Sequence, residues 1–161
     1  MISCVSTRNW ECTPVSGIAT DGRFPDVEKT LLKLKAADKL ELVMFSNGSH
    51  TTLRNAQKTH RVLKSVFPND KVLSVDDVRA YKPSRTSYNH VLKSVGKMDR
   101  PEDVVLVSSN PFDICGARSM GMRALWINRT NANWIDQLGQ GPTWIVKSFS
   151  ELNTFDPTQW R

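Results

Sequence analysis

The sequence contains no hydrophobic run long enough to cross a membrane, and it has few cysteines. No stretch approaches the roughly 18–20 apolar residues of a transmembrane helix, and the first residues lack the basic-then-apolar order of a secretory signal. The three cysteines, Cys4, Cys12 and Cys115, stand at unrelated spacings, which excludes a cysteine metal set and an even disulfide framework. We therefore expect a protein of a reducing, cytoplasmic compartment.

The sequence also lacks a dense run of one charge. Its 22 lysines and arginines exceed its 16 acidic residues, for a formal net charge of +6, but they are dispersed and have no interleaved aromatic residues. This distribution favours a solvated surface, with no nucleic-acid or membrane partner. A length of 161 residues suits one domain with its own core.

Short apolar segments alternate with amphipathic ones along the chain. The apolar segments predict strands over residues 40–45, 71–75, 103–108, 122–127 and 143–148. The amphipathic segments predict helices over residues 26–38, 49–64, 84–95 and 113–120. This alternation indicates an α/β fold with a parallel sheet and helices on both faces, in which ligands bind beyond the carboxyl ends of the strands.

The strand over 40–45 is followed directly by Ser46, Asn47 and Gly48. A glycine permits a sharp turn, and the first amides of the following helix can bind an anion. An ordinary strand-to-helix turn explains the same residues.

A second polar segment contains Lys82, Pro83 and Tyr88. Proline holds the preceding residue in an extended conformation and is tolerated at the start of a helix. Lys82 is therefore expected at the end of an extended segment, with Tyr88 on the next helix. The alternative is an exposed lysine before a helix-starting proline.

The third polar segment follows the strand over 103–108. It contains Ser108, Ser109 and Asn110, and then a lone carboxylate, Asp113, at a predicted helix start. Asp113 is either a site residue or a helix N-cap. Gly116 and Ala117 are small, as expected where a helix packs closely on a sheet.

The three segments in combination resemble the haloacid dehalogenase superfamily, and specifically its L-2-haloacid dehalogenase (type II) branch. The resemblance covers roughly residues 23–155, with residues 1–22 unassigned and 156–161 as a tail. It implies a three-layer, Rossmann-like core. It also implies a reaction in which an aspartate attacks the halogen-bearing carbon of a 2-haloacid, expels halide, and forms an ester that water cleaves.

The resemblance assigns four residues to the substrate. Ser46 would hydrogen-bond the substrate carboxylate, and Asn47 would help to receive the departing halide. Tyr88 would support the network around the lysine, and Phe112 stands where the family places an aromatic residue near the halide.

Four further residues are assigned to catalysis. Lys82 would neutralise and orient the carboxylates of the nucleophile and the substrate. Ser108, Asn110 and Asp113 would position the nucleophile, the lysine and the hydrolytic water. Magnesium-dependent members of the superfamily have two acids in this last segment, but one of those positions is Ser109 here, so we expect no metal or other cofactor.

The remaining candidates for chemistry are weaker. His50, His60 and His90 fall on or beside predicted helices with no partner cluster, and we expect them at the surface or the edge of the core. Cys115 is expected to pack beside the sheet.

The family's first motif, an aspartate at the end of the first strand with a threonine four residues later, is the point where the sequence departs. Asp26 and Thr30 match its spacing, but no apolar strand leads to Asp26, which instead opens a helix. The nucleophile strand and most of the helical cap are therefore expected to be missing. Loss of about five side chains buried at 1.5–3 kcal/mol each would split or rearrange the sheet, unless residues 1–5 replace the strand.

Two hypotheses follow. The first is a type II dehalogenase-like hydrolase that binds a small 2-halo or other carboxylic acid, forms a homodimer as many relatives do, and is inactive as this chain alone. The second is a non-catalytic protein of the same fold that binds a small carboxylate or a protein partner. An in-frame strand with the missing aspartate and threonine, encoded just upstream, would favour the first hypothesis.

Overall fold

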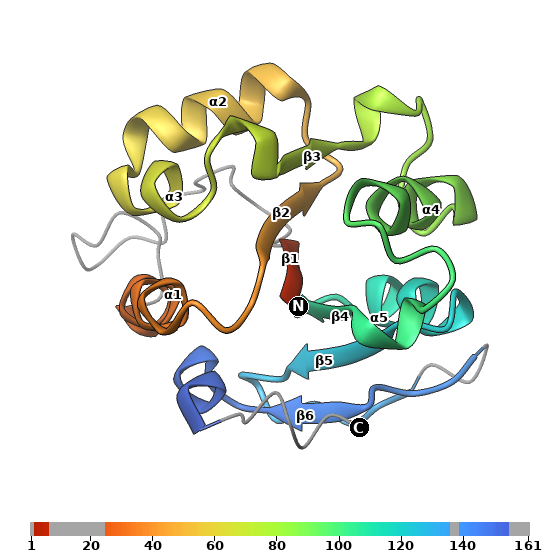
Figure 1. The fold of residues 1–161 in the computed structure, drawn as a ribbon. Helices are drawn as coiled ribbons and strands as arrows, with labels where there is room; N and C mark the ends of the chain where they lie inside the picture. The colour runs from red at the N-terminus through yellow and green to blue at the C-terminus, as the bar shows by residue number, and fades with distance from the viewer. Residues whose placement is uncertain (1, 7–24, 136–138, 155–161) are drawn as a thin grey trace, which may run out of the picture.

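The strands of the computed structural model, which describes residues 2–6, 25–135 and 139–154, form one parallel sheet (Figure 1). They are β1 (Ile2–Ser6), β2 (Leu42–Ser46), β3 (Val72–Ser74), β4 (Val105–Ser108), β5 (Arg123–Ile127) and β6 (Trp144–Val146). Their order across the sheet is β3-β2-β1-β4-β5-β6, and every neighbouring pair is parallel. This is the strand order of the Rossmann fold, so the predicted fold class is confirmed.

The central place in the sheet is filled by β1, where the sequence predicted a missing strand. Ile2 and Ser3 pair with Leu42 and Val43 of β2 on one side. On the other side, β1 pairs with β4 from Ile2 to Ser6, with one register shift between Ser3 and Val5. The sheet is therefore continuous, and the stated alternative, that residues 1–5 replace the strand, is the arrangement found. The expected loss of the helical cap concerns residues 7–24, which lie outside the described residues.

Helices connect successive strands from β1 to β5. The α-helices are α1 (Pro25–Ala37), α2 (His50–Thr59), α3 (Arg61–Val66), α4 (Arg85–Ser94) and α5 (Pro111–Ser119). Short 3-10 turns are η1 (Asn69–Lys71), η2 (Val75–Asp77), η3 (Pro101–Asp103) and η4 (Phe149–Thr154). No helix in the described ranges is long and apolar enough to span a bilayer.

The helix predicted over residues 49–64 is two helices. His60 adopts an extended conformation (φ −121°, ψ 96°), and its N–H donates to the carbonyl of Ala56 to close α2. The break lets α3 turn so that Leu63 and Val66 reach the core. Gln57 adds a link from α2 to the end of α3, because its side-chain amide donates to the carbonyl of Phe67 at 2.6 Å.

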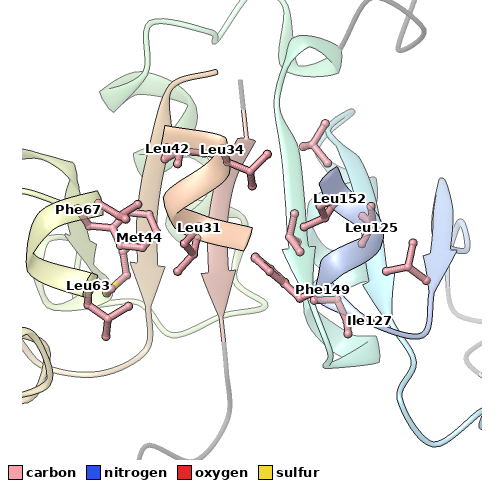
Figure 2. Close-up of a cluster of buried hydrophobic side chains, with 14 of the residues drawn as sticks. Leu31, Leu34, Leu42, Met44, Leu63, Phe67, Leu125, Ile127, Phe149 and Leu152 are labelled. Carbon is pink, nitrogen blue, oxygen red and sulfur yellow. The ribbon is translucent and has the colours of Figure 1, made fainter. Parts of the chain in front are cut away.

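The core has two parts, one on each face of the sheet. Side chains alternate between the faces of a strand, so Met44 of β2 faces one part and Phe45 the other. The first part lies under α1, α2, α3 and η4 (Figure 2). The second lies under α4 and α5. The molecule therefore has three layers, with the carboxyl ends of the strands along one edge.

Candidate active site

The carboxyl ends of three neighbouring strands bring the predicted site segments together. Ser46 ends β2 and Ser108 ends β4, and β1 lies between these two strands. The last residue of β1, Ser6, is in register with Ser108. The candidate site therefore lies at the edge formed by β2, β1 and β4.

Lys82 and Asp113 form a buried ion pair at this edge. The Nζ atom of Lys82 lies 3.1 Å from Oδ2 of Asp113, and the two side chains are 1% and 0% exposed. The hydroxyl of Tyr88 donates to Oδ1 of the same carboxylate at 2.7 Å. Charge pairing and hydrogen bonding together make the burial of these ionic groups tolerable. Three predicted site residues are thus in direct contact.

The end of β2 holds Lys82 at three points. The ammonium donates to the carbonyl of Phe45 at 3.2 Å and lies 4.2 Å from the centre of that residue's ring, a cation–π distance. The backbone N–H of Lys82 donates to Oδ1 of Asn47 at 2.9 Å. The alternative of an exposed lysine is therefore wrong. The Lys82–Pro83 peptide bond is cis.

The Ser46–Gly48 segment is a turn as well as part of the site. The Oγ atom of Ser46 accepts a hydrogen bond from the N–H of Gly48 at 3.0 Å. Ser74 of β3 donates to the carbonyl of Gly48 at 2.8 Å and fixes the turn from the neighbouring strand. The two interpretations of this segment are compatible, because the turn places Asn47 against Lys82.

Asp113 is not the N-cap of its helix. The N-cap of α5 is Asn110, and Asp113 lies in the first turn with its carboxylate directed to Lys82 and Tyr88. Ser108 accepts from the N–H of Asn110 at 3.1 Å, which tightens the turn between β4 and α5. The buried Nδ2 of Asn110 has no hydrogen-bond partner among the described residues. It is thus a donor that a bound anion could use.

The close approach of α5 to α4 depends on Gly116. A Cβ atom added at Gly116 would overlap the hydroxyl of Tyr88. The two small residues were predicted where the helix packs on the sheet; Ala117 is fully buried with Leu106 and Ala124 of the sheet, but the close contact at Gly116 is with helix α4. Phe112 is half-buried on the first turn of α5.

Asp26 lies in a structural contact and not at this site. Its carboxylate accepts hydrogen bonds from Arg129, Ser148 and the N–H of Phe149, at 2.7–3.0 Å. Burial raises the pKa of Asp26, but these hydrogen bonds and the charge of Arg129 lower it to below its usual value. The spacing match of Asp26 and Thr30 is therefore coincidental. Across the described ranges, no three His, Cys, Asp or Glu side chains are grouped to hold a metal ion.

Two supports of the site, Phe45 and Ser74, were not predicted from the sequence. In the sequence, Phe45, whose ring lies under Lys82, is one more residue of an apolar strand. Ser74 was hidden in the strand over 71–75. Each is the residue that ends, or directly precedes the end of, a strand beside the site, and that position is the signal that could have identified them.

The comparisons with known proteins place the chain in a family. A model of the haloacid dehalogenase-like hydrolases matches residues 13–121. The (S)-2-haloacid dehalogenase of Pseudomonas sp. (strain YL) is 39% identical over 125 residues, which is 78% of this chain and 51% of that protein. The haloacetate dehalogenase H-2 of Moraxella sp. (strain B) is 36% identical over 76% of this chain and 52% of that protein.

Comparison with solved structures gives the same family as the sequence comparisons. A crystal structure of an L-2-haloacid dehalogenase superposes with a TM-score of 0.72 at 30% identity, over 81% of this chain and 55% of that one. The chain thus spans about half the length of the relatives it matches. With the family model covering more than half of the sequence and the folds coinciding, the chain belongs to the haloacid dehalogenase-like hydrolases.

Proposed function

We propose that the described residues form the carboxylate-binding part of an L-2-haloacid dehalogenase site, and that this chain alone does not complete the reaction. One observation carries the proposal. The buried ammonium of Lys82, paired with Asp113, lies at the carboxyl ends of the strands that flank β1. The relatives named above as 2-haloacid or haloacetate dehalogenases support the substrate class.

In the family reaction, a carboxylate oxygen of an aspartate at the end of the first strand attacks C2 of the haloacid. The carbon–halogen bond breaks, halide leaves, and water then cleaves the aspartyl ester to give the inverted 2-hydroxy acid and a proton. In this chain, Lys82 stabilises the negative charge of the carboxylates. Asn110 donates through Nδ2 to the bound anion, and Asp113 orients Lys82 and the attacking water.

The nucleophile is the part that this chain lacks at the expected position. Ser6 is the residue at the carboxyl end of β1, in register with Ser108. A serine hydroxyl attacks only when a neighbouring base activates it, and the buried carboxylate described at this edge, that of Asp113, is already paired with Lys82 and hydrogen-bonded by Tyr88. We therefore propose that the unaltered chain binds a small carboxylate without releasing halide.

The direct test is a halide-release assay with (S)-2-chloropropionate. We expect no turnover by the unaltered chain. We expect the Ser6→Asp variant to form a covalent ester, seen as an added substrate-derived mass in intact-protein mass spectrometry and lost in Ser6→Asn. Turnover by the unaltered chain would refute the proposed inactivity. An unmodified Ser6→Asp protein would refute the assignment of Ser6 to the nucleophile position.

Binding is tested separately with (R)-lactate, a 2-hydroxy acid of the product class that cannot react further by this route. We expect (R)-lactate to shift the backbone amide NMR signals of the Ser46–Gly48 turn and of α5. The Lys82→Met variant should lose these shifts. Shifts of equal size in both proteins would contradict a site centred on Lys82.

A non-catalytic carboxylate-binding protein is the second candidate, favoured by the serine at the end of β1. It predicts (R)-lactate binding with no adduct in either Ser6 variant.

For both candidates we propose a cytoplasmic protein that needs no metal, has no nucleic-acid or membrane partner, and forms a homodimer. Sedimentation velocity would measure its oligomeric state.

A further inference from the structure

A single carboxylate, that of Asp77, connects two histidines from different helices. His50 Nε2 lies 2.7 Å from Oδ1 of Asp77, and His90 Nε2 lies 3.2 Å from Oδ2. The side chains are partly exposed, at 40% for His50, 18% for His90 and 35% for Asp77. The histidines were expected to have no partner cluster, and for these two the expectation is wrong.

The three residues join the two outer layers of the molecule. His50 is on α2, which covers one face of the sheet, and His90 is on α4, which covers the other (Figure 1). Asp77 ends η2, which follows β3 at the edge of the sheet. The bridge therefore passes around the edge of the sheet at the same end as the candidate site.

Each element that the bridge joins also carries a residue of the site. His50 is the first residue of α2, directly after the Ser46–Gly48 turn and Ser49. Asp77 precedes Lys82 by five positions on one connecting segment. On α4, His90 follows Tyr88 by two positions. The bridge thus connects the three elements that carry the turn, the lysine and the tyrosine.

Other charged groups lie around the bridge. The carboxylate of Asp76 accepts from the backbone N–H of His50 at 3.4 Å. Arg54 lies one turn further along α2, Lys93 lies one turn further along α4, and Arg79 follows η2. Burial raises the pKa of Asp77, but hydrogen bonds and charge from His50, and then from His90, lower it to below its usual value.

The strength of the bridge depends on pH through the charges of Asp77 and of the two imidazoles. Asp77 is ionised until the pH falls through its lowered pKa, so its contribution is lost only in acid. Imidazoles change charge between about pH 5 and pH 8, and a protonated imidazole makes the stronger, charge-assisted hydrogen bond to a carboxylate. The bridge is therefore stronger at mildly acidic pH than at pH 8.

We propose that Asp77 is a positioning residue that holds the Ser46–Gly48 turn against the Lys82 segment through His50 and His90, so that the site binds carboxylates more tightly at mildly acidic pH. The inference rests on the proposed function, because it concerns affinity at that site. The bridge is a pH-dependent support of the turn. Ser74 is a second support that does not depend on pH, because its hydroxyl donates to the carbonyl of Gly48 and accepts from the N–H of Asp76.

The test is isothermal titration with (R)-lactate at pH 5.5 and pH 8, where lactate stays ionised. For the unaltered chain we expect binding to be about two- to fivefold tighter at pH 5.5, the factor that corresponds to a partly exposed ion pair. Asp77→Asn keeps both imidazoles but removes the carboxylate, and it should abolish the preference. If Asp77→Asn keeps the preference, the histidine charges act at long range and the bridge is refuted. His60→Gln is the matched control and should keep the preference.

Amide hydrogen exchange separates this inference from the proposed function. Absence of (R)-lactate binding at both pH values would refute the proposed function alone. In that case, exchange at residues 46–50 and 76–82, corrected for the intrinsic rate at each pH, still measures the bridge. We expect stronger protection at pH 5.5 in the unaltered chain but not in Asp77→Asn. Equal protection in the two proteins at both pH values would refute the bridge.

Discussion

The ammonium of Lys82 and the carboxylate of Asp113 are both almost completely removed from solvent. Each would be very costly to bury alone, because the interior cannot replace the hydration of an isolated ion. Here the carboxylate accepts from Lys82 and Tyr88, and the ammonium also donates to a carbonyl of β2. The two side chains are thus interdependent parts of the fold as well as of the site.

The Lys82→Met substitution should therefore destabilise the folded protein strongly. It leaves Asp113 buried without its cation, and we expect a loss of about 3–5 kcal/mol in the free energy of unfolding. The double variant Lys82→Met/Asp113→Asn should lose less than the sum of the two single changes, because the second change removes the unpaired charge. Urea unfolding of the four proteins measures the difference, and additive losses would show that the two groups are not coupled.

Gly116 sets the distance between α4 and α5 at Tyr88. Gly116→Ala places a methyl group against the tyrosine ring, and overpacking of this kind costs about 1–3 kcal/mol. Gly141→Ala is the control, since a Cβ there would lie 3.6 Å from its nearest neighbour, Nε1 of Trp134. Thermal unfolding should show a lower midpoint for Gly116→Ala and little change for Gly141→Ala. Equal midpoints would contradict the close fit.

Among the helices and strands, the carboxylate of Asp26 links the start of α1 to residues that follow β5 and β6. Asp26→Asn removes the charge that Arg129, Ser148 and Phe149 recognise, and we expect a loss of about 1.5–3 kcal/mol at pH 7, as for a hydrogen bond to a charged group. Because the folded-state pKa of Asp26 is lowered, its contribution is present above the unfolded value and disappears as the pH falls through the folded value.

Urea unfolding of the unaltered and Asp26→Asn proteins at pH 7 and pH 3 tests this pH dependence. The difference between their free energies of unfolding should be larger at pH 7. Asp38→Asn, at an exposed position just after α1, is the control and should be close to neutral. A gap that widens in acid would contradict the assignment.

The continuity of the described sheet depends on β1. Ser3 pairs with both Val43 and Leu106. Ser3→Pro removes one N–H from the centre of the sheet and leaves a buried carbonyl unpaired, which costs about 1–3 kcal/mol. Hydrogen exchange should accelerate at the amides of β2 and β4 but less at β6. Unchanged exchange in β2 and β4 would show that β1 does not occupy the centre.

Most elements were predictable because each strand is a short apolar run between amphipathic segments. The meeting of Lys82 and Asp113 was predictable too, since parallel strands end along one edge. The division of the helix at His60 was not, because the local pattern stays helical and the break serves packing of Leu63 and Val66. The central place of β1 was only an alternative, because residues 2–6 carry no motif of the family. The bridge at Asp77 was not predictable, because His50 and His90 are 27 and 13 positions away from Asp77 in the sequence, beyond the range of local patterns.

At the scale of the molecule, two core clusters share one sheet. Leu31→Ala creates a cavity under α1, and Leu92→Ala creates one under α4, each at a cost of about 2–5 kcal/mol. Because both clusters depend on the same strands, each variant should unfold in one transition, with coincident far-ultraviolet and near-ultraviolet circular dichroism. Two separate transitions would show that the layers unfold independently.

The central position of β1 also has a consequence during protein synthesis. Translation completes β1 about 100 residues before β4, which at about 5–20 residues per second is a delay of roughly 5–20 s. Over that interval one edge of β1 has no strand to pair with, and an unpaired edge is a template for other chains. We therefore expect the half-made polypeptide on the ribosome, more than the finished molecule, to require a chaperone.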